Sequence, residues 1–509
     1  MKNQRRFTRR SVIGSSVTAV AATWALPHVG VFAQAGTPVA DLLDELVIDL
    51  SGDPDSIDPA VAYSARDWSI VHSIYDGLVS IGADGTIQPL AASSFDTVDE
   101  LTFEASLREG LTFHDGSPVT SQAAIRGVEH LQGGDSLVID LFSTIASVDA
   151  VDDLTVRITC SEPSPWLPAQ LAVWHMLLPE SATADSLANV PVGNGPYRFT
   201  SWEKGSEIRL ERFDDYQPNP AKGQAMAKSV IYRFVPEAST RVADVISGAT
   251  RIASEIPLDQ QGAVESGGAG IVNEPVVGSA WVRIATDTAP FDDVRVRQAL
   301  NLALDLDAIA KVFIGEASTR LASIHPDERS MGFDPDLAPY AYDPDQARGL
   351  LAEAGYEDGL NVVLEMTVAA SQAMAEAMVA QWAEVGIRVE LQISEYAAFN
   401  GNWDDPSAPP LKMSTWSPLY DPHTLLDLVF KGDGYLSRYN NDDANTLILA
   451  ASEETDAAAR ADLYRQLAEV MHDDAACVFL WNLVASYAVR DEASSWQPRG
   501  DEYVLPLKK

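Results

Sequence analysis

The chain contains one short cluster of residue types that commonly bind metal ions. His472 is followed directly by Asp473 and Asp474, and imidazole and carboxylate groups both coordinate divalent cations. The cluster closes a segment in which apolar residues recur at helical spacing, up to Met471. Charged residues at the end of such a helix usually face solvent, so we predict a solvated helix terminus here and no metal site.

Glycine runs are the next candidates, because glycine-rich turns bind the phosphates of nucleotides. Gly193-Asn194-Gly195 begins like a dinucleotide fingerprint, but Arg198 occupies the position of the third glycine. The sequence also lacks the serine-hydrolase elbow, the paired-histidine zinc motif and the phosphate-binding loop. These absences argue against a nucleotide-binding protein and against these classes of hydrolase.

Carboxylates are abundant enough that chance pairs of acids carry little information. The 509 residues include 74 Asp and Glu against 35 Lys and Arg, which gives a formal net charge of −39. A surface this acidic repels phosphate backbones, so we expect no nucleic-acid partner. The same charge favours cationic ligands, or it serves solubility in a salty medium, and the sequence leaves both explanations open.

The only two cysteines, Cys160 and Cys477, lie far apart in the sequence. There is no Cys-x-x-Cys pair, so a zinc site built on thiolates is excluded. The two residues are either a disulfide of an exported protein or, as we favour, separate buried thiols that behave as small hydrophobic side chains.

The first 35 residues have the pattern of an export signal. A basic start is followed by an apolar stretch at 11–26 that is short for a membrane span, which needs about 20 residues. Ala33-Gln34-Ala35 presents small residues at the positions that a signal peptidase reads. The segment 8–13 (TRRSVI) resembles a twin-arginine signal, with an ordinary Sec signal as the alternative. We predict cleavage near Ala35 and a soluble periplasmic protein.

The stretch 343–393 predicts an α/β unit. Asp343-Pro344 supplies a helix cap and a first-turn proline, and Gly355 suits the left-handed position after a helix. The segments 360–368 and 387–393 alternate like strands, and an Ala- and Met-rich helix is expected at 371–385. A strand, a helix and a strand with short links predict parallel strands joined by a right-handed crossover.

Two further helices and two breaks organise the second half of the chain. Asp293 and Asp456 are in position to cap helices with buried apolar faces. Gly- and Pro-rich breaks fall at 262–278 and 401–410. We interpret the first as a chain crossing between two lobes and the second as a long surface or site loop.

Several segments, in order along 42–490, resemble one protein family. They share the family's characteristic turns and helix starts and are found at 53–59 (DPDSIDP), 74–79 (IYDGLV), 107–120 (LREGLTFHDGSPVT), 192–202 (VGNGPYRFTSW), 293–311 (DVRVRQALNLALDLDAIAK) and 416–425 (WSPLYDPHTL). On these motifs the chain resembles the family 5 solute-binding proteins of bacterial ABC importers, which include oligopeptide-, dipeptide- and nickel-binding members. The His114-Asp115-Gly116 turn of the strongest motif is interpreted as structural.

The resemblance implies an α/β fold: a two-lobed, periplasmic-binding-protein-like clamshell with an extra subdomain inserted in lobe one. Lobe one would comprise 36–60, 191–275 and a return segment at 483–509. The inserted subdomain would be 61–190, and lobe two would be 276–482. Two chain crossings would form a hinge, and a ligand that contacts both lobes would favour closure.

The resemblance also implies the function. The protein would capture a small solute, most often a peptide in this family, and deliver it unchanged to an ABC permease in the inner membrane. It would act as a monomer, without a cofactor and without catalytic residues, so it would not be an enzyme. The residues expected to contact the ligand lie in four segments: Tyr63, Ser64 and Arg66; Trp281 and Arg283; Trp403; and Trp416, Tyr420 and Asp421.

One departure from the family leaves the ligand open. Peptide-binding members often place an aspartate a few positions after the loop tryptophan, where it holds the ammonium group of the peptide. Here Ser417-Pro418-Leu419 fills that stretch, and Asp421 comes later, before a helix that it is positioned to cap. Peptide stays the leading ligand, with an oligosaccharide, an opine-like conjugate or a metal chelate as alternatives.

Two other classes of protein compete with this hypothesis. A secreted hydrolase would require an acid or nucleophile set converging in one pocket, which the missing motifs disfavour. A sensory or chaperone-like protein could use the same clamshell without a permease, and the sequence does not separate it from an importer component.

Overall fold

The computed structural model describes residues 42–508, except 369 and 404. The predicted signal at 1–35 lies outside the described residues. Within them, no helix combines the length and the apolar character that crossing a bilayer would require.

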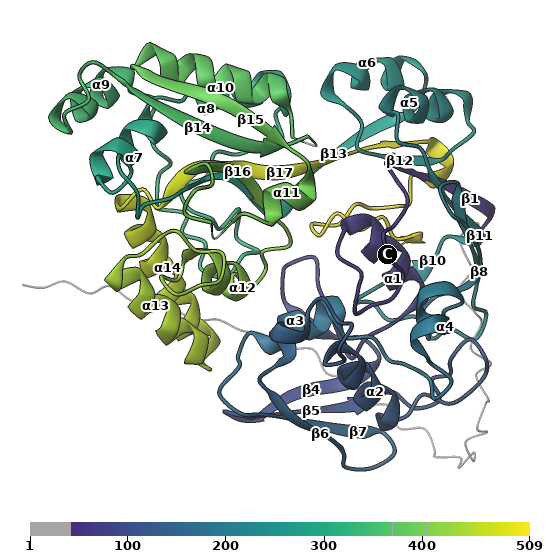
Figure 1. Cartoon of the computed structure of the whole chain (residues 1–509). Helices are drawn as coiled ribbons and strands as arrows, with labels where there is room; N and C mark the ends of the chain where they lie inside the picture. Colours follow the sequence, from purple (N-terminus) through teal and green to yellow (C-terminus); the bar gives the residue numbers. More distant parts are fainter. Residues whose placement is uncertain (1–41, 369, 404, 509) are drawn as a thin grey trace, which may run out of the picture. The chain divides into compact units, whose positions relative to one another are not determined.

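A ten-stranded mixed sheet extends through the described chain (Figure 1). Its order is β15-β14-β16-β13-β17-β12-β1-β11-β9-β8. In chain order, the strands are β1 (Leu43–Leu50), β8 (Tyr197–Glu203), β9 (Glu207–Arg212), β11 (Ala227–Phe234), β12 (Ile252–Ser254), β13 (Gly270–Ile284), β14 (Leu360–Thr367), β15 (Ile387–Ser394), β16 (Leu411–Trp416) and β17 (Cys477–Val489).

The two long strands β13 and β17 join the halves of this sheet. They pair antiparallel from Gly270 with Val489, beside β12, to Arg283 with Cys477, beside β16. The predicted chain crossing is therefore a strand. The break predicted at 262–278 is wrong except at 267–269, because 262–266 belong to the helix Leu258–Ser266 and Gly270 begins β13. Pairing with β17 outweighs the local Gly and Pro content, and Pro275 is accommodated by a register shift before Ser279.

In one half of the sheet, β1 pairs parallel with both β11 and β12. The helices of this half are α1 (Ala65–Ile74), α5 (Ala238–Ser247) and α6 (Leu258–Ser266). The last described residues, β18 (Leu507–Lys508), pair with β10 (Gln224–Ala225) of the same half. The chain thus returns to this half after β17, as the resemblance implies.

A separate four-stranded antiparallel sheet lies between β1 and β8 in the sequence, with order β4-β5-β7-β6. Its strands are β4 (Ala92–Asp99), β5 (Thr102–Leu107), β6 (Ile145–Ala150) and β7 (Thr155–Cys160), and β2 (Val79–Ile81) and β3 (Ile87–Pro89) form a hairpin before it. Helices α2 (Ser121–Leu131), α3 (Leu167–Trp174) and α4 (Ala184–Asn189) accompany it. The turn predicted at 114–116 is confirmed, because Gly116 has φ 85° and the Asp115 carboxylate accepts from the Ser117 amide at 2.9 Å.

The other half contains the predicted parallel crossover, which is confirmed: β14 pairs parallel with β15, and α10 (Gln372–Glu384) connects them. The remaining helices of this half are α7 (Val294–Leu302), α8 (Leu306–Phe313), α9 (Pro344–Glu353), α11 (Tyr396–Asn400), α12 (His423–Leu425), α13 (Asp442–Glu453) and α14 (Ala457–Asp473). Asp293, Asp343 and Asp456 cap α7, α9 and α14 as predicted.

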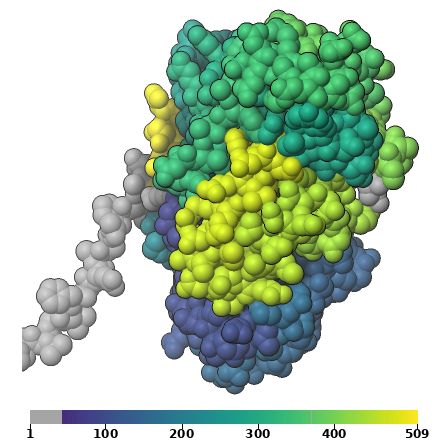
Figure 2. Space-filling view, turned by 90° about the vertical axis from the view of Figure 1, so that its left-hand side faces the viewer, coloured from purple at the N-terminus to yellow at the C-terminus, as the bar shows by residue number. Residues whose placement is uncertain are grey.

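The core forms two main apolar clusters, one on each side of this half of the sheet. One is built from β14, β16 and helices α7 to α10, and the other includes α12 to α14 together with the four-stranded sheet and its helices. In Figure 2 the yellow and yellow-green surface lies between the green residues above and the blue residues below. Helix α3 meets α12 through Gln170, which donates to Thr424 at 2.9 Å, and Trp166, directly before α3, stacks on His423.

The end of α14 differs from the solvated terminus that was predicted. His472 stacks on Tyr340 with ring centroids 4.3 Å apart, and the Asp474 carboxylate forms an ion pair with Arg297. Only Asp473 is fully exposed. Among the described residues, no group of three or more His, Cys, Asp or Glu could hold a metal ion.

Both cysteines are buried and free, so they are separate thiols rather than a disulfide. Burial raises the pKa of both thiols, which lowers their reactivity. We expect Ellman's reagent to label neither thiol in the native protein and two per chain in denaturant. A single thiol, or none, in denaturant without reductant would contradict the unpaired state.

Candidate functional site

A cavity of about 320 Å³ opens where β12 ends, beside residues 484–487 within β17 and the start of α1. This volume lies within the range of small-molecule sites, about 300–1,000 Å³. Its wall is mixed, with charged groups, hydroxyls and apolar side chains. The lining residues are Ala65, Arg66, Ser69, Ser254, Glu255, Ile256, Pro257, Val484, Ala485, Ser486, Tyr487, Glu502 and Val504.

Glu255 is held in this wall by a strained and well-supported turn. Its φ is 53°, a conformation that side chains other than glycine rarely adopt. The buried Arg241 donates from Nη2 to the Glu255 carbonyl at 2.7 Å and from Nε to the Ser254 carbonyl at 2.9 Å. The other Nη of Arg241 binds two further carbonyls, at 2.8 Å each. The arginine therefore fixes where the Glu255 carboxylate emerges.

Glu502 reaches the same cavity from the C-terminal segment 499–505, and its φ is also positive, at 67°. The segment is fixed to both halves of the sheet. The Gly500 carbonyl accepts from the Val277 amide at 2.8 Å, and the Val504 amide donates to Ser69 at 2.8 Å. The second carboxylate is thus positioned by contacts with β13 on one side and α1 on the other.

Charges of both signs meet in this cavity. Burial and, to a smaller extent, the neighbouring carboxylates of Glu255 and Asp501 together raise the pKa of Glu502 to about 7. Arg66, which also lines the cavity, donates to Ser51 Oγ at 3.3 Å, and Ser51 in turn donates to the Glu255 carboxylate. The Arg66 Nε is buried without a partner in the described structure. The cavity therefore offers an unused donor and an unpaired acid.

Comparison with known proteins identifies the family. Residues 86–437 match the model of the bacterial extracellular solute-binding proteins, family 5 Middle. The chain belongs to this family. The glutathione-binding protein GsiB of Pectobacterium atrosepticum is 27% identical over 499 residues, which cover 91% of this chain and 93% of that protein.

Solved structures share the two-lobed fold of this family 5 protein. DppA from Helicobacter pylori, an ABC transporter-associated periplasmic binding protein in complex with the peptide STSA, gives a TM-score of 0.76 at 23% identity and covers 92% of this chain and 99% of its own. AgaA of A. tumefacien R10, in complex with agropinic acid, gives a TM-score of 0.73 at 26% identity and covers 88% and 93%.

The first group of predicted ligand residues surrounds the start of α1 in this family 5 protein. Arg66 lines the cavity, and Ser64 caps the helix by accepting from the Asp67 amide at 3.2 Å. Tyr63 is 56% exposed, and Tyr396 of α11, in the other half, is 60% exposed. Burial raises the pKa of Tyr63, and the phenol of Tyr396 raises it further, so the two exposed rings lie near each other.

Arg283 and Trp403 come together in a buried cluster, away from the cavity. Arg283 donates to the Trp403 carbonyl at 2.6 Å, and its guanidinium lies 5.1 Å from the centroid of that indole. Burial lowers the pKa of Arg283 to about 10. Trp281 is only 1% exposed and packs against Phe430. The predicted contact of these three residues with a solute stays a prediction. In this structure Arg283 anchors the loop at 401–410 through the carbonyls of Trp403 and Pro409.

Asp421 is committed to an internal ion pair. Its carboxylate binds Arg460, with Nη2 to Oδ1 at 3.0 Å, and the two side chains are 7% and 2% exposed. It also accepts from the His423 amide at 3.0 Å, but it does not cap α12 as predicted, because Pro422 occupies the N-cap position. Trp416 ends β16 opposite Ser279 and remains half-buried.

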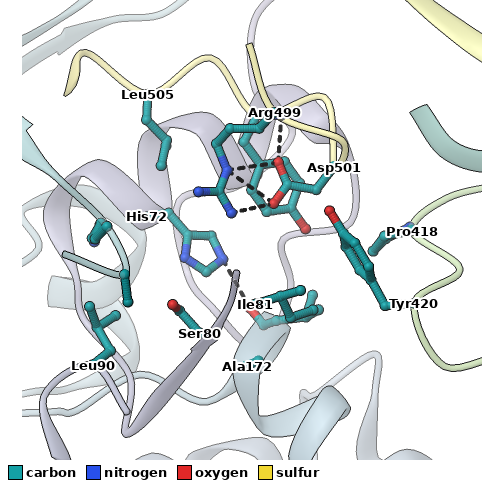
Figure 3. A pocket seen from close by; sticks show the side chains of 14 residues that line it. His72, Ser80, Ile81, Leu90, Ala172, Pro418, Tyr420, Arg499, Asp501 and Leu505 are labelled. Carbon is teal, nitrogen blue, oxygen red and sulfur yellow. Dashed lines mark hydrogen bonds and ion pairs between the residues drawn. The ribbon is translucent and has the colours of Figure 1, made fainter. Parts of the chain in front are cut away.

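Tyr420 lines a second, smaller cavity of about 20 Å³, shown in Figure 3. Its hydroxyl points toward the ion pair of Arg499 and Asp501, while His72 lies on the far side. A space of this size holds about one water molecule. The small cavity therefore marks a packed junction between loop 417–421 and the C-terminal segment rather than a solute site.

Sequence reasoning found Arg66 but missed Glu255 and Glu502. Neither glutamate lies in a motif, and their backbone conformations are not visible in the residue types. The local signals are weak. Glu255 directly follows a short strand, and Glu502 lies two residues after a Pro-Arg-Gly segment. They converge because the C-terminal segment returns to the first half of the sheet.

Proposed function

We propose that the protein is the binding component of an ABC importer, which captures a peptide or similar small solute between two lobes and delivers it to an inner-membrane permease. The observation that carries this proposal is the mixed-charge cavity of about 320 Å³ in a chain that belongs to an extracellular solute-binding family. Fixed groups of both signs suit recognition of a polar solute.

The proposed lobes follow the strands that cross the sheet. Lobe one comprises 36–60, 191–275 and 483–509, with 61–190 as its inserted subdomain, and lobe two comprises 276–482. The pairing of β13 with β17 across both halves supports a hinge at these two crossings. A solute that contacts both lobes would stabilise the closed state by its differential affinity for that state.

A peptide is the leading ligand, because GsiB is named for glutathione, itself a small peptide. An opine-like conjugate is the second candidate, favoured by the complex of AgaA with agropinic acid at 26% identity. Both ligand classes carry amino-acid groups that the charges of the cavity could bind. An oligosaccharide would leave those charges without partners.

The solute leaves unchanged in this proposal, so the protein is not an enzyme. We further propose that it works as a periplasmic monomer. Residues 1–35 would direct export, through the twin-arginine or the Sec route, before cleavage near Ala35. Sequencing the N-terminus of the protein from its own host tests the cleavage site.

Solute binding is tested by thermal melting of the purified protein with peptide and opine pools. A bound solute at 100 times its Kd is expected to stabilise the fold by about 2.7 kcal/mol. Recovery of the bound solute with its original mass is the second expected result. No shift with any pool, or a changed solute mass, would contradict binding without chemistry.

We expect Trp416→Ala to weaken binding at least about tenfold, because an aromatic side chain in contact with a ligand commonly contributes this much. The half-buried ring lies at the end of β16, so its loss should barely change the melting temperature of the free protein. Titration calorimetry with a solute from the pools measures the effect. Unchanged affinity would remove Trp416 from the site.

A further inference from the structure

The hydroxyl groups of the large cavity are already used within the protein. Ser69 donates to the Ala65 carbonyl at 2.6 Å, Ser254 donates to the Asp49 carbonyl at 3.4 Å, and Ser486 accepts from Gln261 at 2.9 Å. The charged groups differ from them. The Glu502 carboxylate has no hydrogen-bond or ion-pair partner among the described residues, and the Arg66 Nε is buried without one.

Among the charged groups of the cavity, the charge that is left without a partner is negative. Arg66 and Glu255 are linked through Ser51, so one positive and one negative charge already offset each other. This leaves Glu502, which lines the cavity and has Glu255 as a neighbour. A half-buried carboxylate beside a second acid is costly unless a cation reaches it.

We propose that this cavity binds the amino-acid end of the solute, with a free ammonium between Glu255 and Glu502 and a carbonyl or carboxylate oxygen on Arg66. The inference rests on the proposed function and adds the chemical class of the solute. It requires a primary ammonium group, which peptides and free amino acids carry and which sugars lack. Glu255 and Glu502 thereby become the residues that determine specificity.

Hydrogen bonds fix the backbone at both Glu255 and Glu502, as expected for residues that bind a ligand. Arg241 fixes the turn at Glu255 through carbonyls alone and leaves its carboxylate free for Ser51 and a ligand. The segment 499–505 fixes Glu502 through backbone contacts. Preorganised carboxylates lose little conformational freedom on binding, which increases affinity.

The same geometry predicts pH-dependent binding. The groups that face Glu502 are Glu255 after β12, Arg66 of α1, Tyr487 of β17 and Asp501 in its own segment. Because the pKa of Glu502 is raised to about 7, it is mostly charged at pH 8 and mostly neutral at pH 6. Affinity for an ammonium group should therefore increase from pH 6 to pH 8.

The test uses a synthetic tripeptide library in which every sequence is present with a free amine and with an acetylated amine. The protein is mixed with the library at pH 8 and at pH 6, and retained peptides are measured by mass spectrometry. Free-amine forms are expected to exceed acetylated forms at least about tenfold at pH 8, since charge-assisted hydrogen bonds are at stake. The excess should shrink at pH 6.

Three variants assign the effect to residues. Glu255→Gln and Glu502→Gln should each reduce the preference for the free amine at least about fivefold, whereas Glu265→Gln, an exposed acid of α6, should leave it unchanged. Glu255 is exposed, so its variant is expected to fold even if the Glu502 variant does not. Melting curves of the free variants check this.

Equal retention of both forms would overturn the inference, as would an unchanged preference in the two variants. Retention of neither form would also overturn it. The thermal-melting assay with mixed pools separates this failure from failure of the proposed function. A solute found there, but without a primary amine, would leave the binding protein standing and reject only the ammonium site.

Discussion

Lys412→Met is expected to lower the free energy of unfolding by about 3–5 kcal/mol, because it leaves a buried charge without its partner. Lys412 and Glu365 form an ion pair at 2.9 Å, and their side chains are 0% and 1% exposed. Lys412 also donates to the Phe399 carbonyl at 2.9 Å, so the pair joins β14 and β16 to α11. Denaturant melts of wild type and variant measure the loss.

The double variant Lys412→Met, Glu365→Met is the matched control. Replacing a whole buried ion pair with apolar side chains of similar size is often neutral, so most of the lost stability should return. A single variant that costs less than about 1 kcal/mol would contradict the buried pair. That result would also mean that contacts other than this ion pair hold α11 and the loop at 401–410 in place.

Asp421→Asn is expected to cost about 3 kcal/mol of stability while changing solute affinity less than about twofold. The substitution leaves Arg460 buried with a neutral partner, although Tyr464 still accepts from it at 2.8 Å. The variant therefore separates a structural role for Asp421 from the ligand contact that the resemblance implies. Melting curves and titration calorimetry on the same preparation give both quantities.

Asp427→Asn is the control for this variant. Asp427 pairs with Lys431 on the same segment, but its side chain is 39% exposed. Exposed ion pairs contribute about 0–1 kcal/mol, so this change should be small. A large loss of affinity in Asp421→Asn, with stability kept, would restore Asp421 to the ligand site.

The local elements could be predicted because their signals are local. Asp343, Pro344 and Gly355 mark both ends of α9 within thirteen residues, and alternation identified β14 and β15. The start of β13 was missed for the opposite reason. Its strand character comes from pairing with β17, about two hundred residues later, while the local Gly and Pro content points to a loop.

The site depended even more on distant contacts. Arg66 was found because it follows a recognisable motif. The partner of Asp421 could not be predicted from the sequence. Asp421 pairs with Arg460 rather than with a ligand because α14 packs against it. Glu255 and Glu502 reach the same cavity because both have a positive φ and because the C-terminal segment returns to the first half of the sheet. Residue types alone predict neither the backbone angles nor this return.

Native mass spectrometry of the protein purified from its own host tests the central claim most directly. The account predicts one small solute per chain, carrying a primary amine, which denaturation releases with the same mass as the free compound supplied to the host. Only empty protein under all growth conditions, or release of a cleaved or modified compound, would contradict a protein that binds its solute and passes it on unchanged.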